Sequence, residues 1–130
     1  MTVIREDDFV QSVADALQFI SYYHPVDYIE HLGRAYEREQ SPAARDAIAQ
    51  ILTNSRMCAE GHRPICQDTG IVVVFLKVGM DVRWEATMSV TDMVSEGVRR
   101  AYTDKDNPLR ASVVGDPDGR DVRQEVVEQD

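Results

Sequence analysis

The sequence predicts an α+β domain in which helices come first and a mixed helical and extended portion follows. Three observations predict it. Apolar residues recur at helical spacing through the first sixty residues or so. A polar turn follows, and after it comes an almost continuous β-branched run at residues 71–78. The length of 130 residues suits one domain, and 43% hydrophobic with 28% charged residues is close to globular averages.

Three helices are expected in the first half of the chain. The first spans about residues 7–23, and the second has Pro25 in its first turn. Ser41 and Pro42 indicate the start of the third, with a capping hydroxyl before a proline whose missing N–H costs nothing there, and Gly61 ends it. The residues expected to face inward are Phe9, Val10, Val13, Ala14, Leu17 and Ile20, then Ile29, Leu32 and Tyr36, then Ala43, Ala44, Ile48, Ile51 and Leu52.

The second half is expected to mix strands and a helix. The polar turn ends in Cys66-Gln67-Asp68-Thr69-Gly70, and the run at residues 71–78 is predicted to be a strand buried on both faces. The remaining expected elements are a helix at 92–102, a connector at 104–108, a short strand at 110–114 and a turn at 116–119. We therefore expect one domain over residues 1–120 and a divergent acidic tail over 121–130.

Charge and hydropathy exclude several classes of partner. The formal net charge of -9 disfavours nucleic acid and anionic membranes, which bind clustered Lys and Arg. No run approaches the ~18 apolar residues of a membrane span, and the first residues lack the basic-then-apolar pattern of a signal peptide. A cytoplasmic location is expected, where Cys58 and Cys66 are thiols or metal ligands and not a disulfide.

The turn at residues 66–70 combines groups that can carry chemistry. A thiolate such as Cys66 can bind iron or attack an electrophile. Asp68 can exchange protons, and Gln67 can orient a carboxylate or a hydroxyl. Composition alone favours a plainer alternative, in which the cysteine is inert and the aspartate satisfies backbone N–H groups. Cys58 is expected in the core, and His24, His31 and His62 show no metal-ligand spacing, although His62 could line a site beside the turn.

Two motifs resemble those of a known enzyme family. The stretch Arg63-Pro64-Ile65-Cys66-Gln67-Asp68-Thr69-Gly70, followed by the β-branched run, is similar to the N-terminal motif of class I fumarate hydratases and tartrate dehydratases. The stretch Asn107-Pro108-Leu109-Arg110-Ala111-Ser112, followed by Asp116-Pro117, also resembles that family. The resemblance covers roughly residues 5–120.

The resemblance implies an iron–sulfur hydro-lyase acting on a small dicarboxylic acid, with fumarate and L-malate first and tartrate and oxaloacetate next. In that family three cysteines hold a 4Fe-4S cluster whose open iron acts as a Lewis acid. By position, Cys66 would be the first ligand, Gln67 and Asp68 would contact the substrate with Asp68 catalytic, and Arg110 would pair with a carboxylate. The family's other two cysteines lie further downstream than this sequence extends.

A site with one of three ligands is expected to be incomplete alone and to need a complementary subunit or a homo-oligomer. Two alternatives stay open. The chain could be a non-catalytic docking or regulatory module that keeps the same fold, or a redox or nucleophilic thiol protein that uses Cys66.

Overall fold

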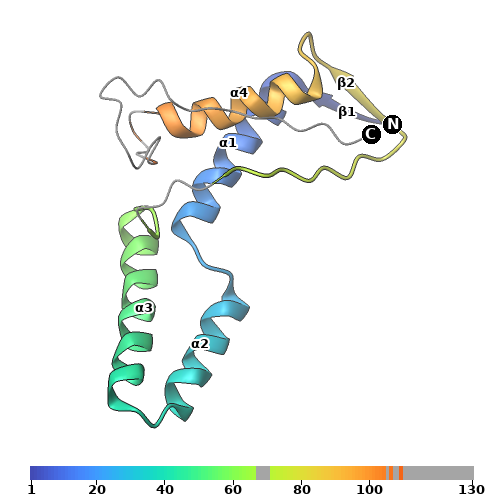
Figure 1. Cartoon of the computed structure of the whole chain (residues 1–130). Helices are drawn as coiled ribbons and strands as arrows, with labels where there is room; N and C mark the ends of the chain where they lie inside the picture. Colours follow the sequence, from blue (N-terminus) through green and yellow to red (C-terminus); the bar gives the residue numbers. More distant parts are fainter. Residues whose placement is uncertain (67–70, 105, 107–108, 110–130) are drawn as a thin grey trace. The chain divides into compact units, whose positions relative to one another are not determined.

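The computed structural model describes residues 1–66, 71–104, 106 and 109 (Figure 1). The chain divides into two compact units, one formed by Met1–Gln18 with Gln67–Asp130 and the other by Phe19–Cys66. The α+β class is confirmed. The elements in chain order are β1 (Thr2–Arg5), α1 (Glu6–Tyr22), α2 (Val26–Arg38), α3 (Pro42–Gly61), β2 (Val82–Glu85) and α4 (Val90–Thr103).

The first unit joins a small sheet to two helices. β1 and β2 pair in parallel, with Thr2 opposite Val82 and Arg5 opposite Glu85. The rings of Phe9 and Trp84 pack in a T-shaped arrangement at a centroid distance of 5.1 Å, which ties α1 to the sheet. The core of this unit lies between α1 and α4, and its buried apolar residues are Val10, Ala14, Leu17, Met93, Val98, Ala101 and Leu109.

Close packing between α1 and α4 depends on Gly97. A Cβ atom built on Gly97 would lie 2.6 Å from Cβ of Val13 and 2.8 Å from the carbonyl oxygen of Val10. Glycine therefore lets the two helix backbones approach more closely than any larger residue would allow. The beginnings of both helices are also joined, because a carboxylate oxygen of Glu6 accepts hydrogen bonds from the N–H groups of Thr87 and Met88 at 2.6 and 2.9 Å.

The second unit is a hairpin of α2 and α3, which lie side by side (Figure 1). Ser41 is the N-cap of α3 and Pro42 its first residue, as predicted. The predicted hydroxyl cap is wrong, because the Ser41 side chain makes no cap hydrogen bond. The carboxylate of Glu39 instead accepts from the N–H groups of Gln40 and Ser41, both at 2.9 Å. This carboxylate binds the two residues before the helix and leaves the first N–H groups of α3 without a side-chain cap from Ser41.

The end of α3 falls at Gly61, as predicted, but the left-handed position that terminates the helix is His62, with φ 48° and ψ 56°. Histidine is uncommon in this region, which glycine adopts without steric cost. The contacts that hold His62 there belong to the candidate site.

The predicted buried strand at residues 71–78 is wrong. Residues 71–79 form neither helix nor strand, and most of their large apolar side chains are exposed, Phe75 at 92% and Ile71 at 90%. A strand buried on both faces needs hydrogen-bonded neighbours and two covering layers. Within the described residues the sheet contains β1 and β2 alone. The run therefore has a local preference for extended backbone but no neighbouring strand to pair with.

The other predicted and observed elements agree in part. The strands β1 and β2 were not predicted, since each is four residues long. The helix predicted at 92–102 is confirmed as α4. The predicted strand at 110–114, the turn at 116–119 and the tail at 121–130 lie outside the described residues. None of the described helices is long and apolar enough to cross a membrane.

Candidate functional site

Cys66 is the one predicted site residue that lies within the described part of the chain. Gln67, Asp68 and Arg110 fall outside it, so their predicted contacts remain predictions. Cys66 is exposed and forms no disulfide, whereas Cys58 is 5% exposed inside the second unit. The sequence prediction that Cys58 belongs to the core is therefore confirmed, and the two thiols of the chain have opposite environments.

The chain leading to Cys66 is anchored first at His62. Its imidazole ring stacks on Tyr22 at a centroid distance of 5.6 Å with an interplanar angle of 6°. Its Nε2 atom lies 2.9 Å from the hydroxyl oxygen of Tyr23. These two contacts attach the left-handed residue after α3 to the last residue of α1 and to the residue that follows it. His62 therefore has a structural role in the segment before Cys66.

Residues 63–65 are held by four further hydrogen bonds. The N–H of Arg63 donates to the carbonyl of Cys58 at 3.1 Å, and the N–H of Ile65 donates to the carbonyl of Ser21 at 2.9 Å. The Asn54 amide donates to the carbonyl of Ile65 at 2.9 Å. The Cys58 thiol donates to the carbonyl of Pro64 at 3.5 Å. The backbone directly before Cys66 is thus fixed to both α1 and α3.

The environment of each thiol indicates which of them suits a metal. A soft thiolate on an exposed residue after an anchored segment can reach an iron atom. Cys58 does not fit, because it is buried and its thiol is engaged with backbone and Asn54 oxygens. No group of three His, Cys, Asp or Glu side chains in the described part of the chain could hold a metal ion. The described residues therefore fit one ligand of a cluster and not a complete set.

A part-buried pair of polar side chains escaped the sequence analysis. The Oγ atom of Ser55 lies 3.0 Å from Nδ1 of His24, whose ring also stacks on Tyr28 at 4.6 Å. Such a pair resembles an activated serine, but Ser55 is 7% exposed and out of reach of a substrate. The pair instead satisfies a buried hydroxyl. Its members are 31 residues apart, so no local motif signals it.

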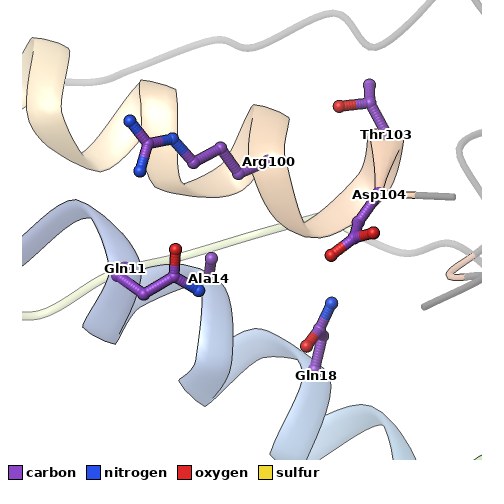
Figure 2. A pocket seen from close by; sticks show the side chains of 6 residues that line it. All are labelled: Gln11, Ala14, Gln18, Arg100, Thr103 and Asp104. Atoms are coloured by element: carbon purple, nitrogen blue, oxygen red, sulfur yellow. The ribbon is translucent and has the colours of Figure 1, made fainter. Parts of the chain in front are cut away.

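A pocket of about 210 Å³ lies between α1 and α4 in the first unit. Figure 2 shows the side chains that line it, which are Gln11, Ala14, Gln18, Arg100, Thr103 and Asp104. Its cation is already paired with two carboxylates, because Nε of Arg100 donates to Glu96 at 3.1 Å and its Nη2 atom lies 3.7 Å from Oδ1 of Asp7. The hydrogen bond from Arg99, and then that from Arg100, lower the pKa of Glu96 to about 2. The pocket contains none of the predicted site residues and has no uncompensated charge that would select an anion.

Comparison with known proteins yields two matches. The family model described as fumarate hydratase (Fumerase) matches residues 10–125. A curated protein of Methanocaldococcus jannaschii, named "Putative L(+)-tartrate dehydratase subunit alpha", is 32% identical over 102 residues, which cover 78% of this chain. The match covers 35% of that relative, so the chain spans about a third of its length. Both units of the structure fall largely within the family match.

Proposed function

Because the chain belongs to the fumarate hydratase family, we propose that it is part of an iron–sulfur hydro-lyase that adds or removes water on a small dicarboxylic acid. The observation that carries the proposal is the contrast between the thiols. Cys66 is exposed at the end of an anchored segment, whereas Cys58 is buried. Cys66 thereby has the accessibility that a metal ligand requires.

Each residue of the motif has a proposed role. The Cys66 thiolate is one ligand of a 4Fe-4S cluster, which when bound supplies a Lewis acid for the substrate's hydroxyl and carboxylate. Dehydration removes a hydroxide from one carbon and a proton from its neighbour and leaves a double bond, and the hydroxide with one proton makes the water that is released. The Asp68 carboxylate accepts the proton from the neighbouring carbon and returns it during hydration. Gln67 orients the hydroxy acid, and the guanidinium of Arg110 pairs with a substrate carboxylate through two parallel hydrogen bonds.

The proposed substrate is a four-carbon dicarboxylate, fumarate and L-malate first and tartrate and oxaloacetate next. The name of the archaeal relative favours tartrate, and the description of the family favours fumarate. Both pairs carry two carboxylates; tartrate has one hydroxyl group more than malate, and oxaloacetate has a carbonyl oxygen that fumarate lacks. Arg110 would bind either pair, so the hydroxyl contacts of the complete site decide between them.

Two observations support a site that is incomplete in this chain alone. The sequence holds two cysteines, and Cys58 is buried, so further cluster ligands have to come from other polypeptide segments. The run from Ile71 to Met80 exposes most of its large apolar side chains. Exposed apolar surface of this kind is typical of a region that a partner covers in a larger assembly. We propose that a complementary subunit or a second copy provides the rest.

A non-catalytic docking or regulatory role is the second candidate. The exposed run from Ile71 to Met80 is equally compatible with it, since docking also covers apolar surface. The two candidates differ in chemistry. A docking module needs no cluster, and its Cys66 is replaceable.

The experiment that tests the proposal places this chain at the corresponding position in the archaeal relative's α subunit, co-expressed with its complementary subunit. After anaerobic reconstitution with iron and sulfide, we expect one 4Fe-4S cluster per chimera and hydro-lyase activity on fumarate or L-tartrate. Cys66→Ser is expected to lose the cluster absorption. Cys58→Ser, which keeps a small hydrogen-bond donor in the core, is the matched control and retains it.

The 130-residue chain alone is expected to hold no stable cluster under the same conditions. A chimera in which Cys66→Ser retains full cluster content would refute the ligand assignment. A chimera that has both Cys58 and Cys66 and binds a partner, but contains no cluster, would establish the docking role instead.

A further inference from the structure

We propose that Asn54 and Cys58 are positioning residues, which hold the backbone of residues 64 and 65 and thereby set the position of Cys66. The two side chains lie four residues apart on one face of α3, and both contact the segment that follows the helix. The holding function stands on these contacts alone. Its purpose, to present a cluster ligand, rests on the proposed function.

The contacts form a small network around two consecutive carbonyl groups. Nδ2 of Asn54 donates to the carbonyl oxygen of Ile65 at 2.9 Å, which is a normal hydrogen-bond length. The thiol of Cys58 lies 3.5 Å from the carbonyl oxygen of Pro64 and 3.7 Å from Oδ1 of Asn54. Having one proton, the thiol donates to one of these oxygens at a time, and the nearer is that of Pro64. The amide and the thiol therefore support each other as well as the loop.

Without these side chains, the backbone hydrogen bond that still ties the segment to α3 is one residue earlier, from the N–H of Arg63 to the carbonyl of Cys58. Pro64 has no N–H group, so its carbonyl is its one backbone hydrogen-bonding group. The remaining bond from Ile65, its N–H to the carbonyl of Ser21, points to α1. Asn54 and Cys58 thus provide the second side of the attachment, and the buried position of Cys58 shields its contact from water.

The test uses the 130-residue chain and does not depend on any cluster. Amide hydrogen exchange of Ile65 is measured by NMR in the wild type, Asn54→Ala and Cys58→Ala. Removing one hydrogen bond is expected to accelerate that exchange about two- to twelvefold. The rate at which iodoacetamide alkylates Cys66, identified from the mass of the modified peptide, is expected to change in the same variants. The reason is that the thiol then samples more positions.

Two matched variants separate positioning from a general loss of stability. Thr53→Ala removes a neighbouring hydroxyl that donates within α3 to the carbonyl of Ala49, and it should leave Ile65 exchange within twofold of the wild type. Cys58→Ser restores a donor and should return exchange and alkylation toward wild-type rates. Unchanged Ile65 exchange in both alanine variants, or an equal acceleration in Thr53→Ala, would overturn the inference.

The purpose of the positioning is tested in the chimera described above. Asn54→Ala is expected to shorten the lifetime of the cluster's visible absorption in air, while Thr53→Ala leaves it unchanged. Accelerated Ile65 exchange with an unaltered cluster lifetime would show that the anchoring does not serve the cluster. If Cys66→Ser retains the cluster, the proposed function fails, and the exchange result still decides whether Asn54 and Cys58 hold the loop.

Discussion

Substituting Gly97 with alanine tests the packing of α1 against α4 directly. The new methyl group would stand 2.6 and 2.7 Å from Cβ and Cγ1 of Val13 and 2.8 Å from the carbonyl oxygen of Val10. Carbon atoms pack at about 3.5–4.0 Å, so the helices have to separate by about 1 Å. One of the close contacts is with backbone, which cannot rotate away. The strain therefore has to spread into the interface.

The magnitude follows from two opposing effects. Alanine in a helix interior is favoured over glycine by about 1 kcal/mol. Overpacking costs about 1–3 kcal/mol, and a gap of up to about 1 Å forfeits a quarter to a half of each contact energy across the interface. With three contacts under 3.0 Å we take the upper end of that cost. The net loss is about 2 kcal/mol, which lowers the melting temperature by about 8 °C for a chain of this size.

Gly33→Ala is the matched control, because nothing lies within 4 Å of its added Cβ in the interior of α2. It is expected to stabilise the second unit by about 1 kcal/mol through helix propensity alone. Melting is followed by circular dichroism and by the fluorescence of Trp84, the single tryptophan, which lies in the first unit. A Gly97→Ala variant that melts at or above the wild-type temperature would refute the packing described for α1 and α4.

Three further predictions concern other contacts. Hydrogen bonds from Met88 and Thr87 lower the pKa of Glu6 below its ordinary value of 4.5, so its contribution to stability is complete above that value and is lost as the pH falls through the lower, folded-state pKa. Glu6→Gln should therefore reduce the urea midpoint at pH 7, with a gap from the wild type that closes as the pH falls below 4.5; a gap independent of pH would contradict this. The hydroxyl of Ser89 accepts from the N–H of Asp92 at 3.1 Å, so Ser89→Ala should cost about 1 kcal/mol, whereas Ser41→Ala, where the side chain makes no cap bond, should cost clearly less in the same denaturation series. Phe75→Glu should reduce binding of the dye ANS by the 130-residue chain without lowering its melting temperature, because this ring is 92% exposed; unchanged dye binding would show that the apolar run is covered in solution.

The helices could be predicted because their information is local. Apolar spacing located α1, α3 and α4 to within a few residues, and Ser41 with Pro42 located the start of α3. The same reasoning failed at residues 71–78, where β-branched composition predicts an extended preference but cannot supply neighbouring strands. It also missed β1 and β2, whose pairing joins positions about eighty residues apart in the chain.

For the candidate site, the sequence by itself determined the chemistry that is available. The motif around Cys66 and its resemblance to the fumarate hydratase family follow from residue identity and order, and the family match bears out that resemblance. The burial of Cys58 was also predicted from sequence, but tertiary structure alone decided what anchors the chain before Cys66. Asn54, Cys58 and Ser21 reach residues 64 and 65 from other turns of α1 and α3. Such contacts depend on where two helices are placed in space, and no periodicity within either helix encodes that placement.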